Sequence, residues 1–154
     1  MNKKIKILIT RLLLSGLIIG GYSMLLSAEQ FTRSALIIQQ AKNDCARFEK
    51  GKFSAAVDAI ALHDLTGDGR PEEIVDASRF ACSSATSMWG GSGGTVLWVV
   101  VEGEAYEFLA HKWRVVDVDG QNVLLLAVHS SECGDTIGPC YRSLVWSNGF
   151  RTPR

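Results

Sequence analysis

The sequence predicts an α+β domain in which an N-terminal helix packs on a mostly antiparallel β-sheet of about six or seven strands. Helical spacing of apolar residues occurs convincingly only between Gln30 and Phe48. The chain that follows consists of short runs rich in β-branched and aromatic residues, separated by Gly, Asp and Asn. Four cysteines, an even number, favour disulfide bonds.

Residues 1–28 have the layout of a secretory signal peptide. A basic opening precedes an uncharged apolar run from Leu12 to Leu26, and small residues follow at Ser27 and Ala28. We therefore expect cleavage after Ala28 and a periplasmic or secreted product, residues 29–154, that forms a single disulfide-stabilised, β-rich domain. The alternative is an uncleaved anchor, since the apolar segment is about as long as the shortest membrane-spanning helices. Only that alternative predicts contact with a membrane.

The charge balance argues against nucleic acid as a partner. Residues 29–154 contain all 16 acidic residues and 12 of the 16 basic ones, which gives a net charge of −4. A mildly acidic domain is not typical of nucleic-acid-binding proteins. The partner class that an exported domain leaves open is an envelope or extracellular protein.

The predicted helix spans Gln30 to Phe48 and ends before Gly51. Its apolar face is expected to contain Phe31, Ala35, Ile38, Ala41, Cys45 and Phe48. The predicted strands are Val57–Leu65, Glu73–Asp76, Thr95–Glu102, Ala105–Ala110, Trp113–Asp117, Val123–His129 and Tyr141–Ser147.

Turn residues and aromatic residues complete the predicted sheet. Glycine-containing hairpin turns are expected at Gly103 and Gly120, where glycine can take a positive φ. The segment Ser83–Gly94 is expected to be a surface loop, and an exposed Trp89 in it would suggest a contact with a partner. The aromatic residues within strands are predicted to belong to the core: Trp98, Phe108, Trp113 and Trp146.

Cysteine spacing favours one disulfide pairing of the three that are open. Cys133 and Cys140 flank a segment with two glycines and a proline that can turn the chain back on itself. We therefore predict a Cys133–Cys140 bond, which leaves Cys45 to pair with Cys82. No C-x-x-C spacing is present, so neither a zinc site nor a thioredoxin-type redox pair is predicted.

The most specific local pattern is the loop from Asp64 to Glu72. Oxygen-bearing side chains occupy its first, third, fifth and ninth positions, and a glycine the sixth. Calcium prefers six to eight oxygen ligands, and alternate side chains of a tightly curled loop can point at one centre. We therefore expect a calcium site formed by Asp64, Thr66, Asp68, the backbone carbonyl of Arg70, and Glu72. The alternative is a plain Asp-Gly hairpin turn with solvated carboxylates, and the residues alone leave both interpretations open.

This run, D-x-T-G-D-G-x-P-E-E-I-V, resembles the calcium loop of FG-GAP and VCBS-type repeats, in which D-x-N-G-D-G-x-x-D joins two β-strands. The resemblance implies the same ligands, with the next strand starting at Ile74. The chain carries one copy, with Thr66 in place of Asn and the longer Glu72 in place of Asp. A modest affinity follows, with a dissociation constant of about 10⁻⁴ to 10⁻³ M.

The part after residue 28 is also similar to small secreted bacterial proteins of unknown function. The elements of those proteins are D-G-D-G-x-P, R-F-x-C and E-C-G-x-x-x-x-P-C; this chain has the D-G-x-P part of the first at Asp68–Pro71, with Thr66 at its first position, and the other two at Arg79–Cys82 and Glu132–Cys140. This resemblance implies no activity.

Two groups of residues have side chains that occur in enzyme active sites, but they lack the sequence spacing of known catalytic or metal-binding motifs. His129, Ser130 and Ser131, with Asp135 nearby, are the residue types of nucleophilic catalysis, but no G-x-S-x-G elbow is present. His63, His111 and His129 lack the H-x-H or H-E-x-x-H spacing of metal sites. We assign no catalytic residue.

Together these observations predict an exported binding or structural module stabilised by one calcium ion. The alternative is an inhibitor of an envelope enzyme, or a small envelope enzyme, that acts through the loops Ser83–Gly94 and Ser130–Cys140.

Overall fold

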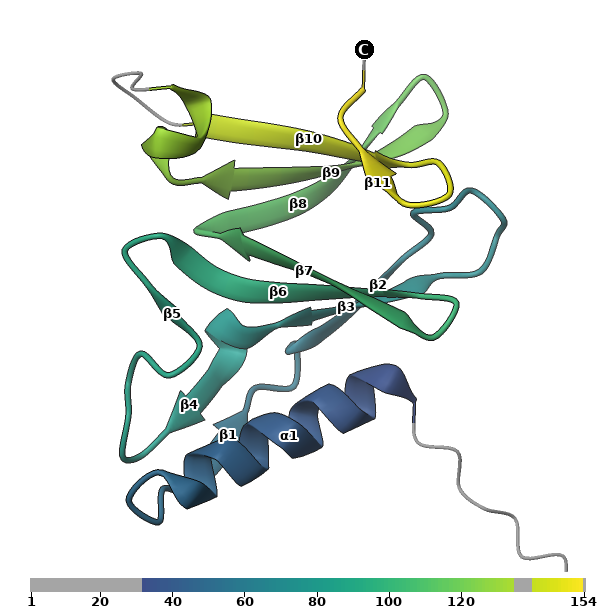
Figure 1. The fold of residues 1–154 in the computed structure, drawn as a ribbon. Helices are drawn as coiled ribbons and strands as arrows, with labels where there is room; N and C mark the ends of the chain where they lie inside the picture. Colours follow the sequence, from purple (N-terminus) through teal and green to yellow (C-terminus); the bar gives the residue numbers. More distant parts are fainter. Residues whose placement is uncertain (1–31, 135–139, 154) are drawn as a thin grey trace, which may run out of the picture.

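The computed structural model describes residues 32–134 and 140–153 (Figure 1). The predicted signal segment and its cleavage site lie outside these residues, as do the first two residues of the predicted helix. α1 (Arg33–Arg47) confirms the helix over its described part. Thr32 caps it, because the Thr32 hydroxyl accepts a hydrogen bond of 3.3 Å from the Ala35 amide.

The buried face of α1 differs from the predicted one at both ends. Ser34 is buried together with Ala41 and Cys45, whereas Phe48 is 49% exposed. Ser34 tolerates burial because its hydroxyl donates a hydrogen bond to the Glu73 carboxylate. The helix is thus attached to the sheet through a polar contact that apolar periodicity does not reveal.

The predicted α+β class with a single sheet is wrong. The protein is mostly β: across the described residues, one α-helix accompanies 11 strands in three antiparallel sheets. The small sheet pairs β1 (Phe53–Ala55) with β4 (Phe80–Cys82).

The two larger sheets are named here by their place in the fold. The helix-side sheet contains β2 (Ile60–His63), β3 (Glu72–Asp76), β5 (Gly90–Gly91), β6 (Gly94–Val101) and β7 (Glu104–Ala110). The C-terminal sheet contains β8 (Lys112–Val118), β9 (Gln121–Val128), β10 (Cys140–Trp146) and β11 (Phe150–Arg151). Two 3₁₀ turns complete the fold, η1 (Ala77–Arg79) and η2 (Ser130–Cys133).

The two larger sheets are separated in the chain between β7 and β8. Only His111 separates these strands, and a hairpin needs a loop of about two residues, so β8 cannot fold back on β7. The chain instead continues into the C-terminal sheet, where the His111 amide donates a hydrogen bond of 2.7 Å to the Ala127 carbonyl. The strand that was expected to extend one sheet therefore starts another.

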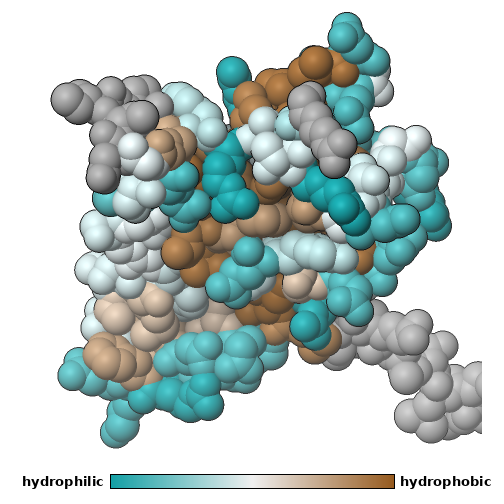
Figure 2. Space-filling view, turned by 45° about the horizontal axis from the view of Figure 1, so that its top comes forward, coloured by the Kyte–Doolittle hydropathy of each residue, from teal (hydrophilic) through white to brown (hydrophobic). Residues whose placement is uncertain are grey.

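The main core lies between the two larger sheets, which form separate layers in Figure 1. One layer contributes Ile74, Leu97, Val99 and Val101, and the other contributes Leu124, Leu126, Val128 and Leu144. The predicted core aromatics Phe108, Trp113 and Trp146 are partly buried against this cluster. On the face drawn in Figure 2, hydrophobic surface gathers across the middle of the molecule, and its lower edge is mainly hydrophilic.

Both predicted hairpins are confirmed. Glu102 and Gly103 connect β6 to β7 with φ values of 51° and 82°. Asp119 and Gly120 connect β8 to β9 with φ values of 52° and 82°. Positive φ at both central residues defines a type I′ turn, whose twist matches that of the paired strands.

Both disulfides have the predicted pairing, Cys45–Cys82 and Cys133–Cys140. Disulfide bonds are typical of proteins from an oxidising compartment, such as the periplasm or the cell exterior. Within the described ranges, no helix has both the length and the apolar character that crossing a membrane requires.

Candidate functional site

The Asp64–Glu72 loop joins β2 to β3, as expected, and its own carboxylates hold it in shape. Asp64 accepts hydrogen bonds from the amides of Gly67 (2.7 Å) and Gly69 (2.9 Å). Gly67 and Gly69 have φ values of 79° and 83°, a region that favours glycine. The first carboxylate of the motif therefore stabilises the curl of the loop.

Glu72 closes the other side of the loop. Only 9% exposed, it accepts hydrogen bonds from the amides of Leu65 (2.6 Å) and Thr66 (3.1 Å). The Thr66 hydroxyl lies 3.4 Å from the second oxygen of the same carboxylate. The buried charge is therefore satisfied by backbone donors.

Asp68 lies at the exposed tip of the loop and contacts Arg70. The carboxylate accepts a hydrogen bond of 2.8 Å from the Arg70 amide and one of 2.6 Å from the guanidinium. The side-chain hydrogen bond from Arg70 lowers the pKa of Asp68, and the backbone hydrogen bond acts in the same direction. The same side-chain contact raises the pKa of Arg70.

The structure brings the expected calcium ligands onto one loop without aiming them at one centre. Asp64 and Glu72 face backbone amides, and Asp68 faces a guanidinium. Among the residues described, no group of three or more His, Cys, Asp or Glu side chains is arranged to hold a metal ion. Thr66, Asp68 and Glu72 do share a depression of about 470 Å³ with Glu73 and Glu102.

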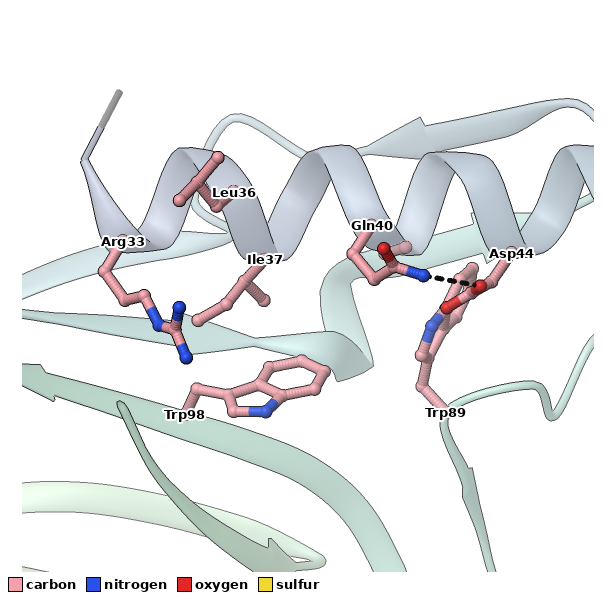
Figure 3. Close-up of a pocket in the computed structure, with 8 residues that line it drawn as sticks. Arg33, Leu36, Ile37, Gln40, Asp44, Trp89 and Trp98 are labelled. Atoms are coloured by element: carbon pink, nitrogen blue, oxygen red, sulfur yellow. Dashed lines mark hydrogen bonds between the residues drawn. The ribbon is translucent and has the colours of Figure 1, made fainter. Parts of the chain in front are cut away.

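A second site, which the sequence analysis missed, is a groove of about 340 Å³ between α1 and the helix-side sheet (Figure 3). We call it the helix groove. Trp89 and Trp98 form one wall of the groove. The opposite wall is made by residues of α1 that recur at helical spacing: Arg33, Leu36, Ile37, Gln40, Ala41 and Asp44. Leu36 is 47% exposed.

Aromatic contacts hold the tryptophan wall. The Trp89 ring packs edge-to-face against Phe53, with ring centroids 5.6 Å apart, and against Phe80, with ring centroids 5.4 Å apart. Trp98 stacks on Phe80 at 6.4 Å and donates a hydrogen bond of 3.0 Å from its indole N–H to Glu107. Trp89 is thus half-buried rather than fully exposed on its loop, and Trp98 lies at a groove rather than in the main core. The sequence analysis singled out Trp89 in its Ser- and Gly-rich segment, but no sequence signal showed that α1 forms the facing wall.

The C-terminal end of α1 is braced next to this groove. The Cys45–Cys82 disulfide joins α1 to β4, and the Ser84 hydroxyl donates a hydrogen bond of 2.6 Å to the Phe48 carbonyl. The helical wall is therefore attached covalently to the strand that precedes the Trp89 loop.

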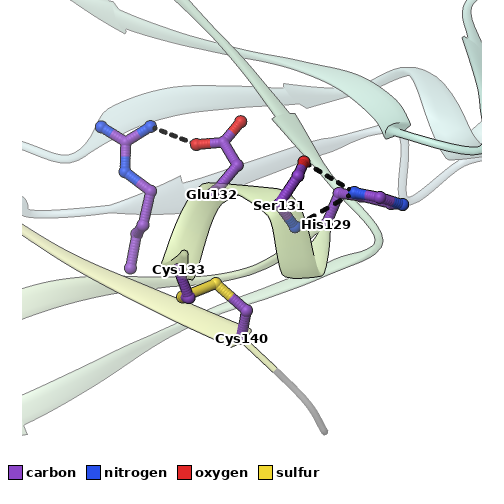
Figure 4. Close-up of a disulfide and its surroundings, with 6 residues drawn as sticks. His129, Ser131, Glu132, Cys133 and Cys140 are labelled. Atoms are coloured by element: carbon purple, nitrogen blue, oxygen red, sulfur yellow. Dashed lines mark hydrogen bonds and ion pairs between the residues drawn. A yellow bond between two sulfur atoms is a disulfide. The ribbon is translucent and has the colours of Figure 1, made fainter. Parts of the chain in front are cut away.

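The His129 region forms a third cluster (Figure 4). His129 Nδ1 lies 2.8 Å from the Ser131 hydroxyl and accepts a weaker hydrogen bond of 3.3 Å from the Ser131 amide. Ser131, not Ser130, is thus the hydroxyl partner of the imidazole. Both side chains are exposed, and Asp135, the third residue of the hydrolase hypothesis, lies outside the described residues. The pair has the geometry of a helix cap rather than of a buried nucleophile.

The three histidines do not meet. His63 packs edge-to-face against Trp113 at 5.9 Å, whereas His111 and His129 have ring centroids 6.4 Å apart. A three-histidine metal site is therefore absent from the described structure.

Comparison of the chain with protein-family models, curated proteins and solved structures found no match.

Proposed function

We propose that this protein is an exported binding module and that the helix groove is its binding surface. The proposal is carried by one observation: two tryptophans lie across an open groove from a face of α1 that contains the half-buried Ile37 and the exposed Leu36. Large apolar side chains left accessible next to polar ones mark interaction sites on protein surfaces. Tryptophan is also among the residues that contribute most to binding energy in interfaces.

Rigidity of the groove supports this proposal. The disulfide at Cys45 fixes one wall, and aromatic packing on Phe80 fixes the other. A surface that is already ordered loses little conformational entropy when a partner binds. Rigidity also favours recognition of one shape over general adhesion to apolar surfaces.

The chemistry of the groove indicates the kind of partner. Leu36, Ile37 and the tryptophans suit a large apolar side chain, and Arg33 lies at one end with an exposed guanidinium. Asp44, at the other end, already accepts hydrogen bonds from Gln40 and Arg47. An envelope or extracellular protein segment that carries an apolar side chain next to an acidic one would complement these walls.

The test is capture of a partner from an envelope and secreted extract with the oxidised protein as bait. Leu36→Lys should abolish capture, because it places a charge in the groove at an exposed helical position that tolerates it in the fold. Tyr141→Ser is the matched control: Tyr141 is 63% exposed on β10, in the C-terminal sheet. A stoichiometric partner lost only with Leu36→Lys supports the proposal. Capture unaffected by Leu36→Lys, or lost equally in both variants, contradicts it.

We further propose that the Asp64–Glu72 loop binds calcium weakly. Asp64 already curls the loop, and the oxygens of Thr66, Asp68 and Glu72 share one depression. Binding requires Asp68 to leave Arg70, and that competition adds a reason for low affinity. A bound ion would stabilise the hairpin of β2 and β3 by mass action.

A further inference from the structure

We propose that His111 and His129 form a surface site for a divalent transition metal ion, with Zn²⁺ as the expected ion and water as the remaining ligands. The two residues are 18 positions apart in a chain that lacks metal-binding spacing, and the fold brings them together. The site is separate from the helix groove and from the Asp64–Glu72 loop.

Strand pairing creates the juxtaposition. His111 follows the last residue of β7, and its amide bonds to Ala127 of β9. His129 follows β9 two residues after Ala127 and begins the turn that leads to η2. The backbone hydrogen bond therefore fixes both imidazoles at the same end of the C-terminal sheet.

The separation is close to what one ion needs. With Zn–N bonds of about 2.0–2.1 Å, two imidazoles on a tetrahedral ion have centroids roughly 5 Å apart, whereas these lie 6.4 Å apart. Both side chains are exposed, so small rotations of the rings can close the difference without disturbing the core. Within the described residues, neither ring nitrogen of His111, nor Nε2 of His129, has a hydrogen-bond partner.

Ser131 serves as a positioning residue for His129. When a metal ion takes Nε2, the single proton of the neutral ring must lie on Nδ1. The Ser131 hydroxyl, 2.8 Å away, can accept that proton in a hydrogen bond, while the weaker 3.3 Å bond from the Ser131 amide is given up. Metal-bound histidines are commonly oriented through their second nitrogen in this way.

The donor set selects the class of ion. Imidazole nitrogen suits Zn²⁺, Cu²⁺ and Ni²⁺, whereas Ca²⁺ and Mg²⁺ prefer oxygen. The Glu132 carboxylate in the adjoining turn pairs with Arg142 at 3.2 Å, so among the described residues the two imidazoles are the protein ligands of the proposed site. Coordination by two residues leaves positions for water, so the ion would remain accessible.

The experiment is isothermal titration of ZnCl₂ into the oxidised protein, prepared without a histidine tag. We expect one ion per chain. His111→Ala and His129→Ala should each weaken binding at least about tenfold, and Ser131→Ala should weaken it about tenfold through loss of the positioning contact. CaCl₂ and MgCl₂ at the same concentrations should give no heat at this site.

His63→Ala is the matched control, since it removes the one histidine outside the pair and should leave Zn²⁺ affinity unchanged. A second readout is NMR of the imidazole protons, in which Zn²⁺ should shift the signals of His111 and His129 and not that of His63. Melting curves of each variant confirm that the fold is intact. Absence of Zn²⁺ binding, binding that survives the loss of either paired histidine, or equal losses in His63→Ala would overturn the proposal.

Discussion

The side-chain amide of Asn122 donates a hydrogen bond of 2.6 Å to the main-chain carbonyl of Asp64. Asn122 lies in β9 of the C-terminal sheet, and Asp64 is the first residue of the loop after β2 of the helix-side sheet. One side chain therefore joins the two layers at the loop. Because the contact is partly buried, water does not readily replace the hydrogen bond when one of the two polar groups is removed.

We expect Asn122→Ala to lower the free energy of unfolding by about 1–2 kcal/mol, since it leaves the Asp64 carbonyl without this donor. Urea unfolding followed by tryptophan fluorescence measures the change. Asn43→Ala is the control, because Asn43 makes only an exposed contact with Gln39 on α1. If Asn122→Ala and Asn43→Ala lower the free energy of unfolding equally, the hydrogen bond between the two layers does not contribute to stability as predicted.

The two disulfides should contribute unequally to stability. Cys45–Cys82 spans 37 residues and Cys133–Cys140 spans 7, so the chain-entropy model assigns them about 4 and about 2 kcal/mol. Cys45→Ala with Cys82→Ala, and Cys133→Ala with Cys140→Ala, test this by urea unfolding. Equal losses in the two double variants would show that restriction of the unfolded chain is not the main contribution.

Calcium should stabilise the protein only at millimolar concentration, and Arg70→Ala should enhance the effect by releasing Asp68. At ten times the dissociation constant, a ligand that binds only the native state adds about 1.4 kcal/mol. Thermal melts with calcium, magnesium or chelator measure the shift in Tm.

The matched variant for this test is Arg79→Ala, which removes an exposed arginine paired with Asp58 beyond the end of the β2–β3 hairpin that is opposite the loop. It should respond to calcium as the unmodified protein does. Asp64→Ala should lose the response. A melting temperature that calcium leaves unchanged in both the unmodified protein and Arg70→Ala would identify the loop as a plain turn.

The Asp68 carboxylate should titrate at a lower pH than an ordinary aspartate, because Arg70 stabilises its charged form. A pKa lowered in the folded state gives stability that is present above the unfolded pKa and is lost as the pH falls through the folded pKa. The unmodified protein and Arg70→Ala should therefore converge in stability below the lowered pKa. NMR titration of the carboxylate checks the direction: Arg70→Ala should raise the pKa of Asp68, and Arg79→Ala should leave it unchanged.

Features governed by neighbours in the chain could be predicted from the sequence. The helix follows from apolar spacing, and the hairpins follow from Glu102-Gly103 and Asp119-Gly120, because glycine after an acidic residue suits positive φ. The Cys133–Cys140 pair was predictable because a short segment with turn residues brings its ends together, and the other pair followed by elimination.

Features governed by contacts between distant residues could not. The short edge strands β1, β4, β5 and β11 carry too few residues for a periodic pattern, and they exist through pairing with distant partners. The burial of Ser34 depends on Glu73, which no helical periodicity identifies. Trp98 was assigned to the core because its strand is apolar on both sides, yet one face of that strand meets α1.

The sequence by itself thus determined the helix, the tight turns, the disulfide partners and the oxygen-rich composition of the Asp64–Glu72 loop. Tertiary structure alone decided that the strands divide into two facing sheets at His111, and that this division places His111 next to His129. It also decided that Glu72 turns toward backbone amides, and that α1 leaves Trp89 and Trp98 beside an open groove. The reason is physical: turn and helix preferences act over a few residues, whereas the choice among burial partners is made by the packing of the whole chain.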